Sequence, residues 1–200
     1  ALSEVCPGQT IIPITYMNSS ANLKAFVGRN GGSVCTSSNA KKIMEWALRP
    51  KDDGGAGGQK LLVFPDQHLG RNTALLEMNF SLDDCAVWDP SQDLGGQTAE
   101  KLQQSPILLW KGHCSVHGTF MPIHIENLRK QYPDIKIICH PECTYEVVSI
   151  SDEHGSTEKI RKYVEAAPAG AVIAIGTEIN LVKRLEKENP DKTILSVNPN

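Results

Sequence analysis

Short apolar runs alternate with amphipathic segments along most of the chain. The runs predict strands and the segments predict helices, because buried parallel strands are continuously apolar whereas a surface helix buries one face. The predicted strands are residues 11–16, 33–35, 60–64, 106–110, 135–138, 147–149, 171–175 and 193–196. The predicted helices are residues 20–28, 40–48, 69–76, 158–166 and 180–187. This alternation is typical of an α/β protein with parallel sheets.

The same order of elements occurs in both halves of the chain. The string TSSN at residues 36–39 and the string HGST at residues 154–157 both place small hydroxyl residues at a helix start after a short strand. We therefore predict two related βαβ units in tandem, each with a short doubly wound parallel sheet. The predicted domains are residues 1–110 and 111–200.

Composition and charge exclude several classes of protein. An apolar content of 40% and a charged content of 22% are ordinary for a globular chain of 200 residues. A net charge of −3 without a basic run argues against a nucleic-acid partner. The apolar runs are far shorter than a transmembrane helix, and the amino terminus lacks the pattern of a signal peptide. We expect a cytoplasmic protein without a membrane partner.

Six cysteines could form disulfides, but their positions favour reduced thiols. Cys35, Cys114 and Cys139 adjoin apolar β-type runs, and the composition is that of a cytosolic enzyme and not of a small disulfide-rich scaffold. The residues expected to be small buried apolar side chains are Cys6, Cys35, Cys85 and Cys139.

Two strings carry most of the candidate chemistry: GHCSVH at residues 112–117 and CHPEC at residues 139–143. Each follows an apolar run, so each is expected at the carboxyl edge of a parallel sheet, where catalytic groups collect. His140 and Glu142 can share a proton relay. Cys114 and His117 could form half of a zinc site, with Cys139 and Cys143 as its other half. A lone cysteine such as Cys114 could instead bind an iron–sulfur cluster together with distant partners.

Further polar residues are expected at the same edges. Tyr16 and Asn18 are separated by one residue at a strand end, so both can orient a polar substrate. Helix amino termini bind anions, and hydroxyl donors at two such starts would suit a phosphate or a carboxylate, although ordinary helix capping explains them equally. These hydroxyl residues are Ser37, Ser38, Ser156 and Thr157. Asp66 is expected to be a turn or cap residue.

Taken together, these strings resemble the quinolinate synthase family. The matching strings are TYMNSS at 15–20, VCTSSN at 34–39, FPDQHLG at 64–70, WKGHCSVH at 110–117, HPEC at 140–143, GST at 155–157 and IGTE at 175–178. The resemblance implies similar three-layer αβα domains around a central active site. It also implies a condensation of iminoaspartate with dihydroxyacetone phosphate to quinolinate, with loss of phosphate and water, in NAD biosynthesis.

The resemblance further implies roles for individual residues. Cys114 would bind a 4Fe-4S cluster that is held by one cysteine from each of three domains, and the open iron would act as a Lewis acid. The substrate site would be lined by Tyr16, Asn18, Ser37, His140, Glu142, Ser156 and Thr157. Among these, His140, Glu142 and Tyr16 would be catalytic, and all seven are expected to open onto one cleft between the two domains.

The chain also departs from the family pattern. The resemblance places the family's first domain before Ala1 and a further cluster cysteine after Asn200, so we expect this chain alone to hold no ordered cluster and to make no quinolinate. The stretches 49–59 and 79–104 are expected to be long loops without an assigned function. Two alternatives stay open, namely a zinc-dependent hydrolase that uses the two halves described above and a non-enzymatic phosphate-binding module.

Overall fold

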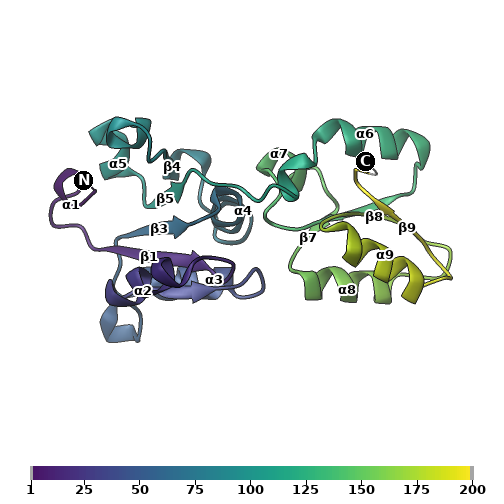
Figure 1. Ribbon diagram of the computed structural model, residues 1–200, viewed down its shortest axis with the longest axis horizontal. Helices are drawn as coiled ribbons and strands as arrows, with labels where there is room; N and C mark the ends of the chain where they lie inside the picture. Colours follow the sequence, from purple (N-terminus) through teal and green to yellow (C-terminus); the bar gives the residue numbers. More distant parts are fainter. Residues whose placement is uncertain (1, 199–200) are drawn as a thin grey trace. The chain divides into compact units, whose positions relative to one another are not determined.

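The computed structural model describes residues 2–198, which form two compact units (Figure 1). The first unit ends at His113 and the second begins at Cys114. Each unit contains one parallel sheet, as predicted. The domain ranges 1–110 and 111–200 stay a prediction of domain organisation.

The sheet of the first unit has the strand order β2-β1-β3-β5-β4. Its strands are β1 (Ile11–Tyr16), β2 (Ser33–Cys35), β3 (Lys60–Phe64), β4 (Cys85–Trp88) and β5 (Ile107–Trp110). All neighbouring strands run parallel. Because helices cover both faces of the sheet, the central strands are buried on both sides, which explains their continuously apolar sequences.

Helices pack on both faces of this first sheet. Met44 of α3 and Leu69 of α4 share a core with Ile14, whereas Val27 of α2 and Leu102 of α5 share another core with the opposite face. The helices are α1 (Leu2–Val5), α2 (Ala21–Arg29), α3 (Ala40–Leu48), α4 (Gln67–Glu77) and α5 (Ala99–Gln104), with short 3₁₀ turns at Lys51–Asp53, Leu82–Asp84 and Asp93–Gly96. This arrangement confirms a three-layer αβα unit.

The second unit repeats the three layers with a smaller sheet of order β7-β6-β8-β9. Figure 1 shows α6 and α7 over one face and α8 and α9 over the other. The strands are β6 (Lys136–Cys139), β7 (Glu153–His154), β8 (Val172–Gly176) and β9 (Thr193–Ser196). The helices are α6 (Pro122–Gln131), α7 (Tyr145–Val148), α8 (Thr157–Ala166) and α9 (Ile179–Glu188), with a 3₁₀ turn, η4, at His117–Thr119.

Two expectations about the elements are wrong. The predicted strand at 147–149 is the helical turn α7, and the strand that pairs with β6 is Glu153–His154. The predicted loop 79–104 contains β4 and α5, because Cys85–Trp88 pairs with β5 along its whole length. The predicted loop 49–59 is a loop between α3 and β3, with a short 3₁₀ turn at Lys51–Asp53. Among the described residues, every helix is too short or too polar to cross a lipid bilayer.

Candidate functional site

Three segments of the second unit bring polar side chains to the carboxyl edge of its sheet. Cys114 and His117 come from the loop that leads into α6, and η4 begins at His117. Glu142 comes from the turn after β6, and Thr177 directly follows β8. Because β6 and β8 are neighbouring parallel strands, the residues after them lie at the same edge.

A β-turn after β6 fixes the string HPEC. The Cys143 N–H donates to the His140 carbonyl over 2.9 Å and closes the turn, and Pro141 holds its second position at a fixed φ. The His140 N–H donates to the Gly176 carbonyl at the end of β8 over 2.9 Å. The turn is therefore tied to the sheet, and Glu142 is held rigidly.

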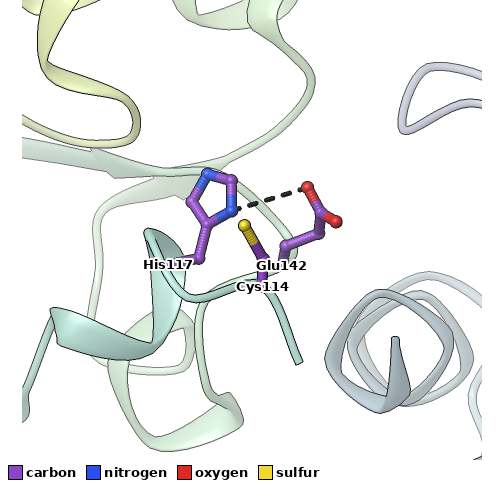
Figure 2. Close-up of side chains that lie close together, drawn as sticks. All are labelled: Cys114, His117 and Glu142. Carbon is purple, nitrogen blue, oxygen red and sulfur yellow. Dashed lines mark ion pairs between the residues drawn. The ribbon is translucent and has the colours of Figure 1, made fainter. Parts of the chain in front are cut away.

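The side chains of Cys114, His117 and Glu142 point toward one another (Figure 2). One sulfur, one ring nitrogen and one carboxylate oxygen from these residues all lie within 4.8 Å of one another. Glu142 Oε2 lies 3.5 Å from His117 Nδ1 and 3.3 Å from His140 Nδ1. His117, His140 and Glu142 are buried, whereas Cys114 is partly exposed. Two imidazoles thus converge on one carboxylate oxygen beside a thiol.

The two imidazole rings are stacked, with centroids 4.5 Å apart and an interplanar angle of 13°. Burial lowers the pKa of His117 to about 4. Burial, together with the neighbouring His117, lowers the pKa of His140 to about 3. Both rings are therefore neutral near pH 7, the form that can accept a proton or bind a metal.

The proposed four-residue zinc site is wrong for the described residues. Cys139 and Cys143 lie in the apolar core of the second unit, fully buried, and their thiols hydrogen-bond to each other. Cys143 Sγ also donates to the Gly176 carbonyl over 3.4 Å, and Ser151 Oγ donates to Cys139 Sγ over 3.1 Å. Glu142, and not these thiols, joins Cys114 and His117.

The remaining cysteines agree with the sequence analysis. Cys6, Cys35 and Cys85 are buried among apolar side chains, as is Cys139. All six cysteines lie within the described residues, and none forms a disulfide. Burial raises the pKa of the Cys85 thiol to about 11, which keeps it protonated and inert.

The hydroxyl residues of the second unit lie at the start of α8. Ser156 is the N-cap of this helix, and its Oγ accepts a hydrogen bond from the Lys159 N–H over 3.3 Å. Ser156 is buried, whereas Thr157 is exposed. The capping interpretation of Ser156 is confirmed, and its hydroxyl proton stays available to an anion.

The three predicted site residues of the first unit lie at the carboxyl edge of its own sheet. Tyr16 ends β1 and is buried, and Asn18 lies just beyond it and is exposed. Ser37 is partly buried in the turn between β2 and α3. Tyr16 pairs with Cys35 in the parallel ladder, so β1 and β2 end at the same level of the sheet. The common cleft for all seven residues stays a prediction.

The structure adds two residues that the sequence analysis did not assign to the substrate site. The sequence predicts His117 only as a zinc ligand, yet its ring contacts both Glu142 and His140. Thr177 received no role, yet its Oγ1 lies 3.4 Å from His117 Nε2. The string IGTE could have indicated a site role for Thr177, because it places this residue directly after a strand end.

Comparison with known proteins identifies what this chain is similar to. The family model described as quinolinate synthetase A protein matches residues 1–200. A quinolinate synthase of Nocardioides sp. strain JS614 is 55% identical over 194 residues, which cover 97% of this chain and 49% of that protein. The quinolinate synthase of Bacillus subtilis (strain 168) is 52% identical over 196 residues, or 96% of this chain and 50% of that protein. That of Rhodopirellula baltica is 50% identical over 199 residues, or 99% and 49%. The chain spans about half the length of these relatives.

Proposed function

Because the chain belongs to the quinolinate synthetase A family, we propose that its complete gene product is a quinolinate synthase. The reaction condenses iminoaspartate with dihydroxyacetone phosphate and yields quinolinate for NAD biosynthesis. The observation that carries the proposal is the buried convergence of His117, His140 and Glu142 beside the Cys114 thiol. This is a concentration of proton donors and acceptors that a structural core does not need.

Cys114 fits one ligand position of a 4Fe-4S cluster. Cys114 is a partly exposed residue, and thiolates are the preferred ligands of such clusters. The neighbouring His117 Nδ1 is buried and has no hydrogen-bond partner among the described residues, which is typical of a site that is completed by a further group. The family resemblance assigns the other cluster cysteines to segments outside this chain. When bound, the cluster would supply a Lewis acid for a substrate oxygen or nitrogen.

The chain's own residues would hold and move protons. Glu142 lies within 3.3 Å of His140 Nδ1, so this pair can pass a proton between a carboxylate and a neutral imidazole during dehydration and ring closure. Tyr16 at the end of β1 would add a phenol to the same chemistry. The groups that would bind and orient the substrates are Tyr16, Asn18, Ser37, Ser156 and Thr157.

We also propose a cytoplasmic location, small-molecule substrates, and no nucleic-acid or membrane partner. Six thiols without a disulfide in the described residues agree with a reducing compartment. A net charge of −3 without a basic run in the sequence argues against a nucleic-acid partner.

A mononuclear zinc site is the second candidate. Catalytic zinc has three protein ligands and an open position, and one sulfur, one imidazole nitrogen and one carboxylate oxygen converge here within 4.8 Å. This set replaces the four-residue set predicted from the sequence, and it would support a hydrolase. A phosphate-binding module without any metal is the remaining alternative.

Metal analysis and a product assay on the complete gene product decide among these candidates. After anaerobic reconstitution with iron and sulfide, we expect bound iron and sulfide and the formation of quinolinate from iminoaspartate and dihydroxyacetone phosphate. Cys114→Ser should lose the cluster absorbance, and Cys143→Ser, a buried thiol of the same unit, should keep it. Stoichiometric zinc without quinolinate would support the hydrolase, and phosphate binding without metal would support the binding module.

A further inference from the structure

We infer that Cys143 is a positioning residue whose thiol fixes the turn that carries Glu142 to the end of β8. This inference rests on the proposed function only for its effect on catalysis. The contacts that carry it lie within the second unit, between the turn after β6 and Gly176.

The Gly176 carbonyl holds both ends of this turn. It accepts the His140 N–H over 2.9 Å and the Cys143 S–H over 3.4 Å. A carbonyl oxygen has two lone pairs, so it can accept both hydrogen bonds at once. His140 and Cys143 are the first and fourth residues of the turn, and Glu142 lies between them. The segment that carries the carboxylate therefore has one anchor on each side of it.

The second anchor restricts a motion that the first one leaves open. The Cys143 N–H donates to the His140 carbonyl, but this bond lies inside the turn and does not attach it to β8. If the His140 N–H were the remaining bond to Gly176, the closed turn could pivot about that point. Such a pivot would change the distance of 3.5 Å between Glu142 Oε2 and His117 Nδ1, because His117 comes from a different segment. The Cys143 thiol opposes this motion.

Packing fixes the direction of the Cys143 thiol. Cys143 is 0% exposed and belongs to the apolar core of the second unit. Its thiol also hydrogen-bonds to that of Cys139, whose sulfur lies 3.1 Å from Ser151 Oγ. An added Cβ at Gly176 would lie 2.6 Å from Cys139 Sγ, so the glycine leaves the space that this sulfur occupies. The thiol that reaches the Gly176 carbonyl is thus held by its neighbours.

Hydrogen exchange of backbone amides, followed by NMR on this chain, tests the anchor directly. Cys143→Ala removes the S–H, so the His140 amide should exchange about threefold to tenfold faster relative to the amides of β6, as expected for the loss of one hydrogen bond. Cys143→Ser supplies a hydroxyl donor and should keep the protection. Cys6→Ala is the matched control, because the buried Cys6 thiol donates to the Leu102 carbonyl over 3.6 Å in the first unit. It should leave the His140 amide unchanged.

Two results would overturn the inference. One is a Cys143→Ala chain in which the His140 amide loses no more protection than the amides of β6, which is what a purely structural role would give. The other comes from the infrared difference spectrum between the wild type and Cys143→Ser, which identifies the Cys143 S–H stretching band. A band at the frequency of a thiol that donates to no acceptor would exclude the anchor, and this measurement does not need Cys143→Ala to fold.

Steady-state kinetics of the complete gene product measure the catalytic consequence. Cys143→Ala should lower kcat by about threefold to tenfold and leave KM and the cluster absorbance unchanged, because the change misaligns a proton-transfer group. Cys143→Ser should regain most of the loss, and Cys6→Ala should change nothing. An unchanged kcat in a folded Cys143→Ala protein would remove Cys143 from catalysis. A wild type that makes no quinolinate would refute the proposed function, and the exchange measurement would still decide whether Cys143 anchors the turn.

Discussion

The two units share one architecture but place different polar groups at the carboxyl edges of their sheets. In the first unit, the buried Asp66 accepts hydrogen bonds from the N–H groups of His68 and Leu69 and so caps α4. In the second unit, the buried Glu142 faces two imidazole rings and lies near a thiol. Both carboxylates lie shortly after a strand. The first accepts hydrogen bonds from backbone N–H groups, whereas the second faces other titratable side chains.

The two units therefore differ in how their polar groups affect stability. Some groups stabilise the folded state, whereas others are destabilised by their burial in it. Hydrogen bonds from Lys111 and Ser91 hold the pKa of Asp89, in the first unit, below its usual range, so its charge is stabilised in the folded state. Burial acts in the opposite direction on His117 and His140, whose charged forms are disfavoured in the folded state. Burying imidazoles without partners that stabilise their charged forms lowers the stability of the second unit, as is common at functional sites.

The strongest test of this contrast is to neutralise one carboxylate in each unit. Glu142→Gln keeps size and hydrogen bonding but removes the base, so quinolinate formation by the complete gene product should fall by about 10²–10⁴-fold while the protein stays folded. Asp66→Asn should leave the activity within a few-fold of wild type, because Asn caps a helix as well as Asp does. Chromatographic quantification of quinolinate, with circular dichroism as a folding control, makes the comparison. Equal losses in both variants would break the proposed distinction between the two edges.

Acidification should weaken the second unit more steeply than the first. The folded-state pKa values of His117, about 4, and His140, about 3, lie below the ordinary value of 6.5, so the unfolded chain binds more protons between these limits. Their contribution is fully present above pH 6.5 and is lost as the pH falls, by about 1.4 kcal/mol per pH unit for each histidine.

Urea unfolding at pH 7, 6 and 5 measures this slope in each unit. All three tryptophans lie in the first unit and report it by fluorescence, and the NMR signals of β8 report the second. His117→Gln should make the slope of the second unit shallower, whereas His113→Gln, at an exposed site, should not. Equal slopes for the two units in the wild type would contradict the burial argument.

The strands and helices that could be predicted are those whose sequence pattern agrees with their environment. The bounds of β1, β3, β9 and α3 match the predictions residue for residue, because continuous apolar runs end at polar turns there. Val147 and Val148 resemble a strand by their β-branching, but they follow the turn after β6 and pack into the core as one helical turn. β7 is only Glu153–His154, a polar pair that carries no apolar signal.

From the sequence, only contacts between residues of the same short motif could be predicted. The spacing of His140 and Glu142 correctly predicts that they interact, because a turn links them. The approach of Cys114 and His117 to Glu142 depends on how the loop packs against the end of β6, which no local pattern encodes. The zinc set failed because Cys139, as the last residue of β6, points into the apolar core on one face of the sheet.

Adding one methyl group to a closely packed glycine in each unit tests whether packing changes reach the histidines only in the second unit. An added Cβ at Gly176 would lie 2.6 Å from Cys139 Sγ, and one at Gly70 would lie 2.8 Å from Leu109 Cδ2. Each alanine variant should lose about 1–3 kcal/mol of unfolding free energy in its own unit, as overpacked cores do. Only Gly176→Ala should also shift the histidine NMR signals, because the Gly176 carbonyl holds the His140 N–H. Shifts of the His117 and His140 signals in Gly70→Ala would contradict this.

The smallest expected effect separates a helix cap from a ligand-binding hydroxyl. Ser20 caps α2 in the first unit and Ser156 caps α8 in the second, through hydrogen bonds of 3.2 and 3.3 Å. Alanine at either position should cost about 1 kcal/mol of unfolding free energy, because each change leaves one backbone N–H without its cap.

Aspartate at either position keeps the cap, so Ser20→Asp and Ser156→Asp should retain the stability of the wild type. If Ser156 also binds the phosphate of dihydroxyacetone phosphate, Ser156→Asp should raise the KM for that substrate by charge repulsion, whereas Ser20→Asp should not. An unchanged KM in a stable Ser156→Asp protein would leave Ser156 with the capping role alone.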